Sequence, residues 1–275
     1  TQDAVIYGTQ NKISVNGGWH DAGDYGRYVV PGAMAVAQML LAYEVNPSFM
    51  GQYTNAAAHK PELPDYFNEL KYELDWMMTM QREDGALYHK VSCYNFCGFI
   101  LPDQEKEEIV ISPVSATATG DFAAATAMAV RFYQKYDAEY ADRLAAASRR
   151  AYEALQNMNI PGGFKNPEEI VTGEYGDPCD EDERYWAAAE LYKTFGDEKY
   201  RRDFEERAAG KIYHGYGWGA MGSYGNLAYI TTSNPVSEEL KEKIKASMID
   251  LGRHKLEIEE VDGYGTALAS EEYTW

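Results

Sequence analysis

The 275-residue sequence predicts an all-α fold in which helices pair along the chain, as in an α/α barrel. Apolar residues recur at helical spacing in about eight segments. The connections alternate between short links and long loops rich in Gly, Pro, Tyr and acidic residues. Long loops in a compact domain are usually functional, so such loops on one side suggest a site at one end of a barrel. An irregular helical bundle is the alternative that this pattern leaves open.

The helical segments are supported by different residues. Pro31–Tyr43 is apolar and rich in Ala, whereas Asp65–Gln81 carries aromatic and aliphatic side chains at helical spacing. Ser115–Tyr136 is rich in Ala and Thr, so it can approach its neighbours closely. The other expected helices are Ala138–Gln156, Asp180–Thr194, Glu198–Ala209, Ser223–Thr231 and Ser237–Leu251. Because no linker or low-complexity segment interrupts the chain, residues 1–275 are interpreted as a single domain.

Composition excludes two classes of partner. The chain is 45% hydrophobic and 25% charged, an ordinary globular balance, but its formal net charge is −19. Such a field repels phosphate, so no nucleic acid is expected. It suits a neutral substrate or divalent cations, although acidic surfaces also serve solubility alone. The longest apolar run, Ala33–Ala42, is too short to span a bilayer, and no membrane partner is expected.

Paired carboxylates stand in a glycine-rich string near the N-terminus. Asp21 and Asp24 are three residues apart within GGWHDAGDYGRY (residues 17–28), and its glycines allow a tight turn with positive φ. Two carboxylates in one cleft can activate water, because one takes the proton while the other orients the water. On spacing alone, such a pair is more often an Asx turn or a solvated loop.

The longer string GGWHDAGDYGRYV resembles the signature of glycoside hydrolase family 9, whose members are inverting endoglucanases and cellulases with an (α/α)6 barrel. Further segments resemble the same family in the same order: AVIYGT from Ala4, MQREDGALYHKV from Met80, SPVSATATGDFAAA from Ser112, YGDPCDEDERYWAAAELY from Tyr175 and EYTW from Glu272. The resemblance covers nearly the whole chain. It implies hydrolysis of β-1,4-glucosidic bonds in cellulose or related β-glucans by a secreted or cell-surface protein.

The resemblance also implies residue roles. Asp24 matches the general base, and Asp21 matches the partner that holds the nucleophilic water. The aromatic fraction of 13%, with 23 tyrosines, fits a sugar-binding cleft, although core packing accounts for many of these rings. Candidate substrate-binding residues, by position or by loop context, are His20, His89, Tyr175, Trp218 and Trp275. For each of them a structural role is the alternative.

The family's general acid is a Glu in a downstream motif, which this sequence does not contain. Glu259, Glu260, Glu271 and Glu272 do not stand in that context. We therefore expect a catalytic-domain fragment truncated at the C-terminus, with an incomplete barrel and the missing C-terminal part as a partner. A catalytically silent glycan-binding fragment is the alternative function.

Acidic residues before Tyr185 are candidates for a metal site. In the resembling family, the Asp-Glu pair that matches Asp182 and Glu183 lies in a calcium site, and calcium prefers such oxygen ligands. A further family ligand corresponds to Ala220 here. Asp180 and Glu183 also form a capping-box pattern, which is the structural alternative. A metal–diphosphate enzyme built on the same acidic residues is disfavoured, because this loop is polar rather than apolar.

The three cysteines do not form a disulfide framework. His89, Cys93 and Cys97 follow an H-x3-C-x3-C pattern. A structural zinc site needs four ligands, and only three are visible. We therefore do not expect zinc; the two cysteines could instead form a bridge or pack as small apolar residues.

Overall fold

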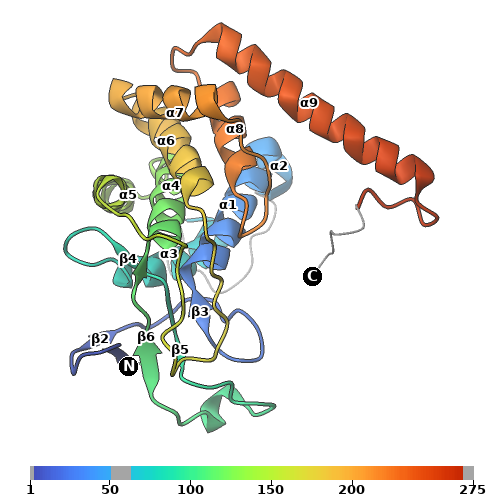
Figure 1. The fold of residues 1–275 in the computed structure, drawn as a ribbon. Coiled ribbons are helices and arrows are strands. Elements are labelled where there is room, and N and C mark those ends of the chain that lie inside the picture. Colours follow the sequence, from blue (N-terminus) through green and yellow to red (C-terminus); the bar gives the residue numbers. More distant parts are fainter. Residues whose placement is uncertain (1–2, 51–62, 269–275) are drawn as a thin grey trace.

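Helices dominate the computed structural model, which describes residues 3–50 and 63–268 (Figure 1). They are α1 Val29–Val45, α2 Pro47–Met50, α3 Asp65–Thr79, α4 Ala116–Tyr133, α5 Ala138–Gln156, α6 Glu181–Phe195, α7 Glu198–Gly210, α8 Gly222–Thr231 and α9 Glu238–Val261. Every segment predicted to be helical is a helix. The largest difference lies in α9, which continues past Gly252 because one glycine costs a helix only about 1 kcal/mol.

Alternate helices form two layers, as the α/α arrangement predicts. Helices α1, α4, α6 and α8 pack side by side in chain order, so α1 and α8 are the ends of this inner row. Helix α5 packs on α4, α7 on α6, α9 on α7 and α8, and α3 on α1 and α4. Short links join α4 to α5, α6 to α7 and α8 to α9, and longer loops lead from α3, α5 and α7 to the next inner helix.

Short strands below the helices were not predicted from the sequence (Figure 1). Strands β1 Asp3–Ile6, β2 Lys12–Ser14, β3 Arg27–Tyr28, β5 Lys90–Cys93 and β6 Ile109–Ile111 form a sheet in the order β2-β1-β6-β5-β3, in which only β1 and β6 pair in parallel. Strands β4 Leu87–Tyr88 and β7 Val114–Ser115 form a second, antiparallel pair. Strands β3 and β7 run directly into α1 and α4, so the sheets orient the loops around those helix starts.

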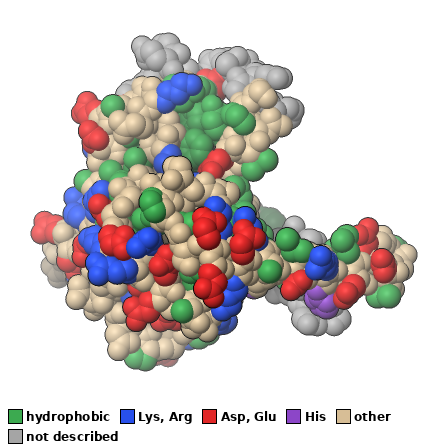
Figure 2. Space-filling model, turned by 90° about the horizontal axis from the view of Figure 1, so that it is seen from above, with side chains coloured by type: hydrophobic (Ala, Val, Ile, Leu, Met, Phe, Trp, Pro, Cys, Tyr) green, Lys and Arg blue, Asp and Glu red, His purple; other side chains and the backbone are tan. Residues whose placement is uncertain are grey.

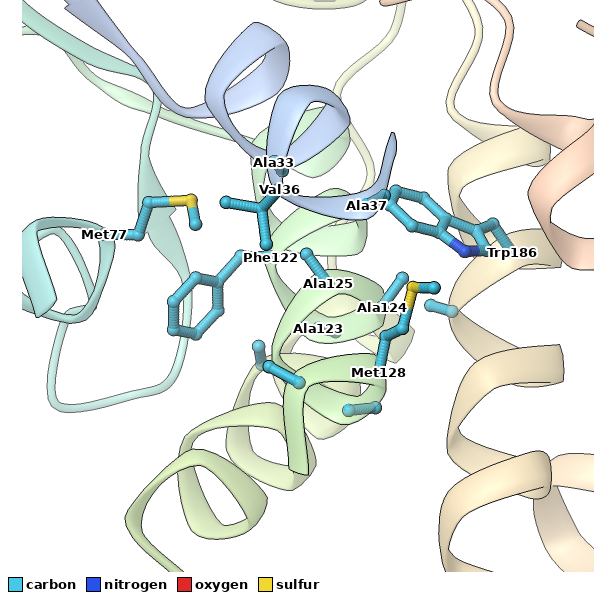
Figure 3. Close-up of a cluster of buried hydrophobic side chains, with 14 of the residues drawn as sticks. Ala33, Val36, Ala37, Met77, Phe122, Ala123, Ala124, Ala125, Met128 and Trp186 are labelled. Atoms are coloured by element: carbon cyan, nitrogen blue, oxygen red, sulfur yellow. The ribbon is translucent and has the colours of Figure 1, made fainter. Parts of the chain in front are cut away.

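Helix α4 lies at the centre of the core. All residues from Ala116 to Val130 are buried. Figure 3 shows Phe122 on the side of α4 toward Met77 of α3, and Met128 on the side toward Trp186 of α6. A helix enclosed on all sides can approach its neighbours only if its side chains are small, and the Ala-rich sequence of α4 meets that requirement.

Helix α9 projects from the body of the molecule (Figures 1 and 2). Of its residues only Ile244 is buried, while Ile249 and Leu256 are more than half exposed. Within the described residues, none of the helices is long and apolar enough to cross a membrane.

We expect Ala125→Leu on α4 to destabilise the protein by about 1–3 kcal/mol, because overpacking a close-packed core forces side chains from their rotamers. Ala246→Leu on the exposed face of α9 is the matched control, with an expected change within about 0.5 kcal/mol. Chemical denaturation of both variants measures the difference. Equal stabilities would show that α4 is not the constrained centre of the fold.

Candidate active site

The loop that carries the paired carboxylates lies against α3. Gly17 and Gly18 have φ values of +87° and +84°, and a Cβ on Gly18 would lie 2.5 Å from Cγ of Trp76. Only glycine fits this close approach. The buried Arg27 guanidinium donates hydrogen bonds to the carbonyls of Val15 and Gly17. Helix α3 and β3 therefore fix the start of the loop.

Two carboxylates of α3 hold Trp19. The Trp19 amide donates to Oε2 of Glu73 at 2.5 Å, and its indole Nε1 donates to Oε1 of Glu69 at 2.7 Å. Glu73 is 1% exposed. Burial raises the pKa of Glu73 to about 8, although the Trp19 amide and the charge of Arg27 act in the opposite direction. Glu73 is therefore an uncharged or partly charged acceptor beneath the loop at neutral pH.

Asp21 and Asp24 line one cavity of about 570 Å³. Asp24 is 8% exposed; its Oδ2 accepts a hydrogen bond of 2.5 Å from the Tyr28 hydroxyl, while its Oδ1 is buried without a protein partner. Asp21 is exposed, and both its oxygens accept from the Tyr175 hydroxyl at 2.9 and 2.8 Å. Neighbouring protein atoms displace water and raise the pKa of Asp21; the Tyr175 hydroxyl lowers it, and the charge of Asp24 raises it.

Aromatic rings form the wall of this cavity. The Tyr175 ring lies edge-on between Tyr28 and Trp218, with ring centroids 4.9 and 5.1 Å away. Trp218 lines the cavity, as predicted, and so does Phe96, which is 57% exposed and was not predicted. Tyr25 and Tyr175 are non-glycine residues with positive φ, at +53° and +46°. A cavity with broad apolar faces and few polar groups suits a sugar ring.

Two further candidate substrate-binding residues are His20 and Trp275. His20 is exposed, packs against Tyr25 with ring centroids 5.3 Å apart, and lines a neighbouring cavity of about 260 Å³ that Asp21 also borders. Trp275 lies outside the described residues.

The prediction that His89 lines the cleft is wrong. His89 is 0% exposed and stacks on Phe164 with ring centroids 3.7 Å apart. Its Nδ1 bonds Oγ of Ser115 and its Nε2 bonds the Glu174 carbonyl, both at 2.8 Å. Burial lowers the pKa of His89 to about 3, so the ring is a neutral support for the Glu174 backbone. With both nitrogens engaged, it does not face Cys93 or Cys97 as a zinc ligand.

The predicted metal ligands belong to a buried acidic cluster. Oxygens of Asp177, Asp182 and Glu183 lie within 4.8 Å of one another, and all three residues are buried. Asp121 on α4, which is 0% exposed, faces the same cluster, since the charges of Asp182 and Asp177 raise its pKa in addition to burial. Neither carboxylate oxygen of Asp121 or Glu183 has a protein partner. Asp121 was missed, although a lone acid in an Ala-rich helix is itself a signal.

The capping-box alternative is not realised. Asp180 makes no side-chain capping bond to α6; it pairs instead with Arg184 at 2.8 Å. The pKa of Glu183 is raised well above its usual value by burial and by the neighbouring charges of Asp121 and Asp182. Four buried carboxylates that repel one another and have free oxygens form a site that fits a divalent cation.

Paired helices with carboxylates and aromatic rings in one cavity at their loop end fit the class of glycoside hydrolases, which use carboxylates to act on a bound sugar. The family model described as Glycosyl hydrolase family 9 matches residues 1–264. Endoglucanase D of Acetivibrio thermocellus is 41% identical over 286 residues, 99% of this chain and 45% of that protein. A cellodextrinase of Butyrivibrio fibrisolvens is 34% identical over 291 residues, 99% of this chain and 53% of that protein.

Solved structures agree with these relatives. A single mutant of a thermostable endoglucanase from Alicyclobacillus acidocaldarius is similar with a TM-score of 0.92 and 34% identity, over 98% of this chain and 52% of that one. A structure of AaCel9A with a cellobiose-like isofagomine gives a TM-score of 0.91 at 34% identity, over 98% of this chain and 52% of that one. The chain thus belongs to glycosyl hydrolase family 9, its helices form part of an (α/α)6 barrel, and it spans about half the length of these relatives.

We expect Glu73→Gln to flatten the dependence of stability on pH. The pKa of Glu73 is about 8 in the folded protein and about 4.3 in an unfolded chain. Between these values only the folded state holds the proton, so stability falls as pH rises from 4 to 8. Glutamine has no proton to lose, which removes that decrease, worth on the order of a few kcal/mol.

Melting temperatures at pH 5 and pH 8 measure this effect. Glu69→Gln is the matched control, because Glu69 contacts the same tryptophan but is exposed. Its decrease between the two pH values should equal that of the unchanged protein. An equal decrease in Glu73→Gln would contradict the buried, protonated carboxyl.

Proposed function

We propose that the complete domain hydrolyses β-1,4-glucan with inversion of the anomeric carbon, with Asp24 as the general base and Asp21 assisting. The observation that carries this proposal is the buried, unpartnered Oδ1 of Asp24 beside Asp21 in one aromatic-lined cavity. In an inverting glycosidase the base takes a proton from a water that attacks the sugar. Oδ1 of Asp24 is the oxygen free for that water.

The two tyrosines give the two aspartates different roles. Tyr28 occupies one oxygen of Asp24, and burial raises the pKa of Tyr28, so it remains a donor. Tyr175 donates to both oxygens of Asp21, and its pKa is also raised by burial. The fixed hydroxyls orient both carboxylates before substrate arrives, which is the usual condition for efficient catalysis. Asp21 can then hold the water while Asp24 deprotonates it.

Aromatic side chains support the substrate class. Tyr175 and Trp218 form one wall of the cavity, and Phe96 lies exposed at its edge. Sugar rings present apolar C–H faces that pack on such rings, while their hydroxyls bond the carboxylates. The relatives named endoglucanase and cellodextrinase support a β-glucan or cello-oligosaccharide. A polymer of this kind is met outside the cell, which supports a secreted or cell-surface enzyme.

The general acid is proposed to come from the part of the family 9 domain that this chain does not span. Among the described residues, the carboxylates that line the cavity are Asp21, Asp24 and Glu174. Glu174 accepts hydrogen bonds from Lys165 and from the Asn166 amide at 3.1 and 2.9 Å. Burial raises its pKa, but these bonds outweigh burial and leave the pKa below its usual value. A general acid needs the opposite shift, so Glu174 is unsuited to that role.

Calcium is proposed for the cluster of Asp121, Asp177, Asp182 and Glu183. The unpartnered oxygens of Asp121 and Glu183 fit a cation, because buried carboxylates without partners repel one another. Ala220, which corresponds to a further ligand in the family, has no side-chain oxygen, but Asp121 adds a carboxylate to the cluster. The Cys179 amide donates a hydrogen bond to Asp177, and the Met221 amide donates one to Asp182. These bonds hold both carboxylates in place. A bound cation would offset part of the cluster's negative charge and join α4 to α6 and its preceding loop.

In the full-length protein, Asp24→Asn should lower kcat on a soluble cello-oligosaccharide by about 10²–10⁴-fold, because an amide cannot take the proton. Sugar binding, measured by calorimetry, should persist. Glu174→Gln is the control: it lines the same cavity and should retain activity within about tenfold. Azide should restore some rate to Asp24→Gly, where there is room for it. Full activity of Asp24→Asn would contradict the assignment of Asp24 as the general base.

The anomer formed first separates inversion from retention. Proton NMR should show the α-anomer as the initial product of the complete enzyme. Early β-anomer would instead make Asp24 a nucleophile or a bystander. The isolated 1–275 chain should bind the sugar without turnover, and robust hydrolysis by it would place the acid within these residues.

Calcium removal should lower the melting temperature, because a ligand that binds only the folded state stabilises it by about 2.7 kcal/mol at 100 times its Kd. Asp121→Asn should shrink this difference while raising stability in excess chelator, since it removes one repelling charge. Glu181→Gln, in the exposed first turn of α6, should leave the difference unchanged. An unchanged melting curve with chelator, together with no metal by elemental analysis, would count against the site.

A further inference from the structure

Lys90 on β5 is a buried cation that makes its hydrogen bonds to neutral groups. It is 0% exposed. Its ammonium donates to the Thr172 carbonyl at 3.2 Å, to the Thr172 hydroxyl at 3.0 Å and to the Gly173 carbonyl. Among the described ion pairs, none includes Lys90. A buried charge without an ion-pair partner is costly, so its presence calls for a function.

The Lys90 bonds are part of a set that fixes the segment before Tyr175. Oγ of Ser92 bonds the Thr172 hydroxyl at 2.8 Å, and the Val171 amide donates to the Tyr94 carbonyl at 2.9 Å. The buried His89 ring bonds the Glu174 carbonyl. Segment 171–174 therefore runs antiparallel along β5, held largely by side chains of the strand. The segment delivers Tyr175, whose hydroxyl bonds Asp21.

Lys90 also lies near Tyr28, the tyrosine that bonds the other aspartate. Its ammonium lies 5.4 Å from the centroid of the Tyr28 ring, and the Tyr28 hydroxyl donates to Asp24. A Cβ on Gly173 would lie 3.2 Å from the Tyr28 hydroxyl oxygen, so the segment held by Lys90 packs directly on this tyrosine. The negative groups that act on the ammonium are Asp24 and Glu174.

We propose that Lys90 is a positioning residue for both aspartates of the site: it anchors the segment that brings Tyr175 to Asp21, and its positive charge attracts the Asp24 carboxylate. This inference rests on the proposed role of Asp24 as the base. Lys90 itself is buried and does not line the cavity that Asp21 and Asp24 share. Its action is through the Thr172–Gly173 backbone and through the electric field at Asp24.

The charges around Lys90 define the expected dependence on pH. Burial lowers the pKa of Lys90 to about 8, while Asp24 and Glu174 act in the opposite direction. Four groups face Lys90. They are Asp24 in the loop that carries the paired carboxylates, Tyr28 on β3, Glu174 in segment 171–174, and the neutral His89, which directly precedes Lys90. Lys90 is thus charged at acidic pH.

The experiment compares Lys90→Met and Lys90→Arg in the full-length enzyme by the pH profile of kcat/KM. Loss of a nearby cation raises the pKa of a carboxylate. The acid limb of Lys90→Met should therefore move to higher pH by about 0.5–1 unit, whereas Lys90→Arg should keep the original limb even if kcat falls. A folded Lys90→Met with an unmoved acid limb would overturn the proposal.

Lys193→Met is the matched control. Lys193 is partly buried, but it bonds Glu44 and Thr231 and lies in the last turn of α6. Its removal should leave the pH profile unchanged. An equal shift in this variant would show that loss of any lysine moves the profile, which would also overturn the proposal.

Thr172→Val tests the anchor from the side of the segment even if the Lys90 variants do not fold, because it removes a hydroxyl that accepts from the Lys90 ammonium at 3.0 Å. Hydrogen exchange at the Val171 amide, which donates to the Tyr94 carbonyl, should be faster in this variant. Unchanged exchange would overturn the anchoring role. Failure of the underlying function is recognised separately, because it appears as full activity of Asp24→Asn with a normal Lys90→Met profile.

Discussion

The close approach of α4 to α6 is the constraint on which the rest of the structure depends. A Cβ on Gly120 would lie 2.8 Å from Cβ of Glu183, so the two helices meet there with no space for a side chain. Strand β7 leads into α4, and the segment containing Thr172 and Tyr175 precedes α6. The distance between these two helices therefore sets the distance between the sheets and the loop that together form the cavity.

Three buried ionisable side chains are accommodated in the protein interior in three different ways. Glu73 is held as an acceptor with a raised pKa, Lys90 is a cation surrounded by backbone oxygens, and Asp121 joins a cluster of like charges. Each arrangement costs stability by itself. Glu73 holds the loop that carries Asp21 and Asp24, Lys90 holds the segment that leads to Tyr175, and Asp121 is itself a proposed metal ligand. The buried polar groups thus act as the rigid supports that a site built on loops otherwise lacks.

The helices and the paired carboxylates could be predicted because their signals are local. Helical periodicity extends over many residues, and Asp21 and Asp24 share one short glycine-rich turn. The strands could not be predicted, since two to four residues are too few to show alternation. The prediction for His89 failed for a related reason: the sequence does not reveal which way the residue between β4 and β5 points. Phe96 and Asp121 reach their sites only through contacts between distant segments.

Tyr25 and Tyr175 show how this site limits the thermal stability that the protein can reach. Both hold a left-handed backbone, which costs a non-glycine residue roughly 1–2 kcal/mol. Selection for thermal tolerance alone would favour glycine or asparagine at such positions. At Tyr175 that change would delete the hydroxyl that holds Asp21. Heat-adapted descendants of this enzyme should therefore keep the unfavourable tyrosine and gain their tolerance elsewhere, for example along α9, where substitutions touch little.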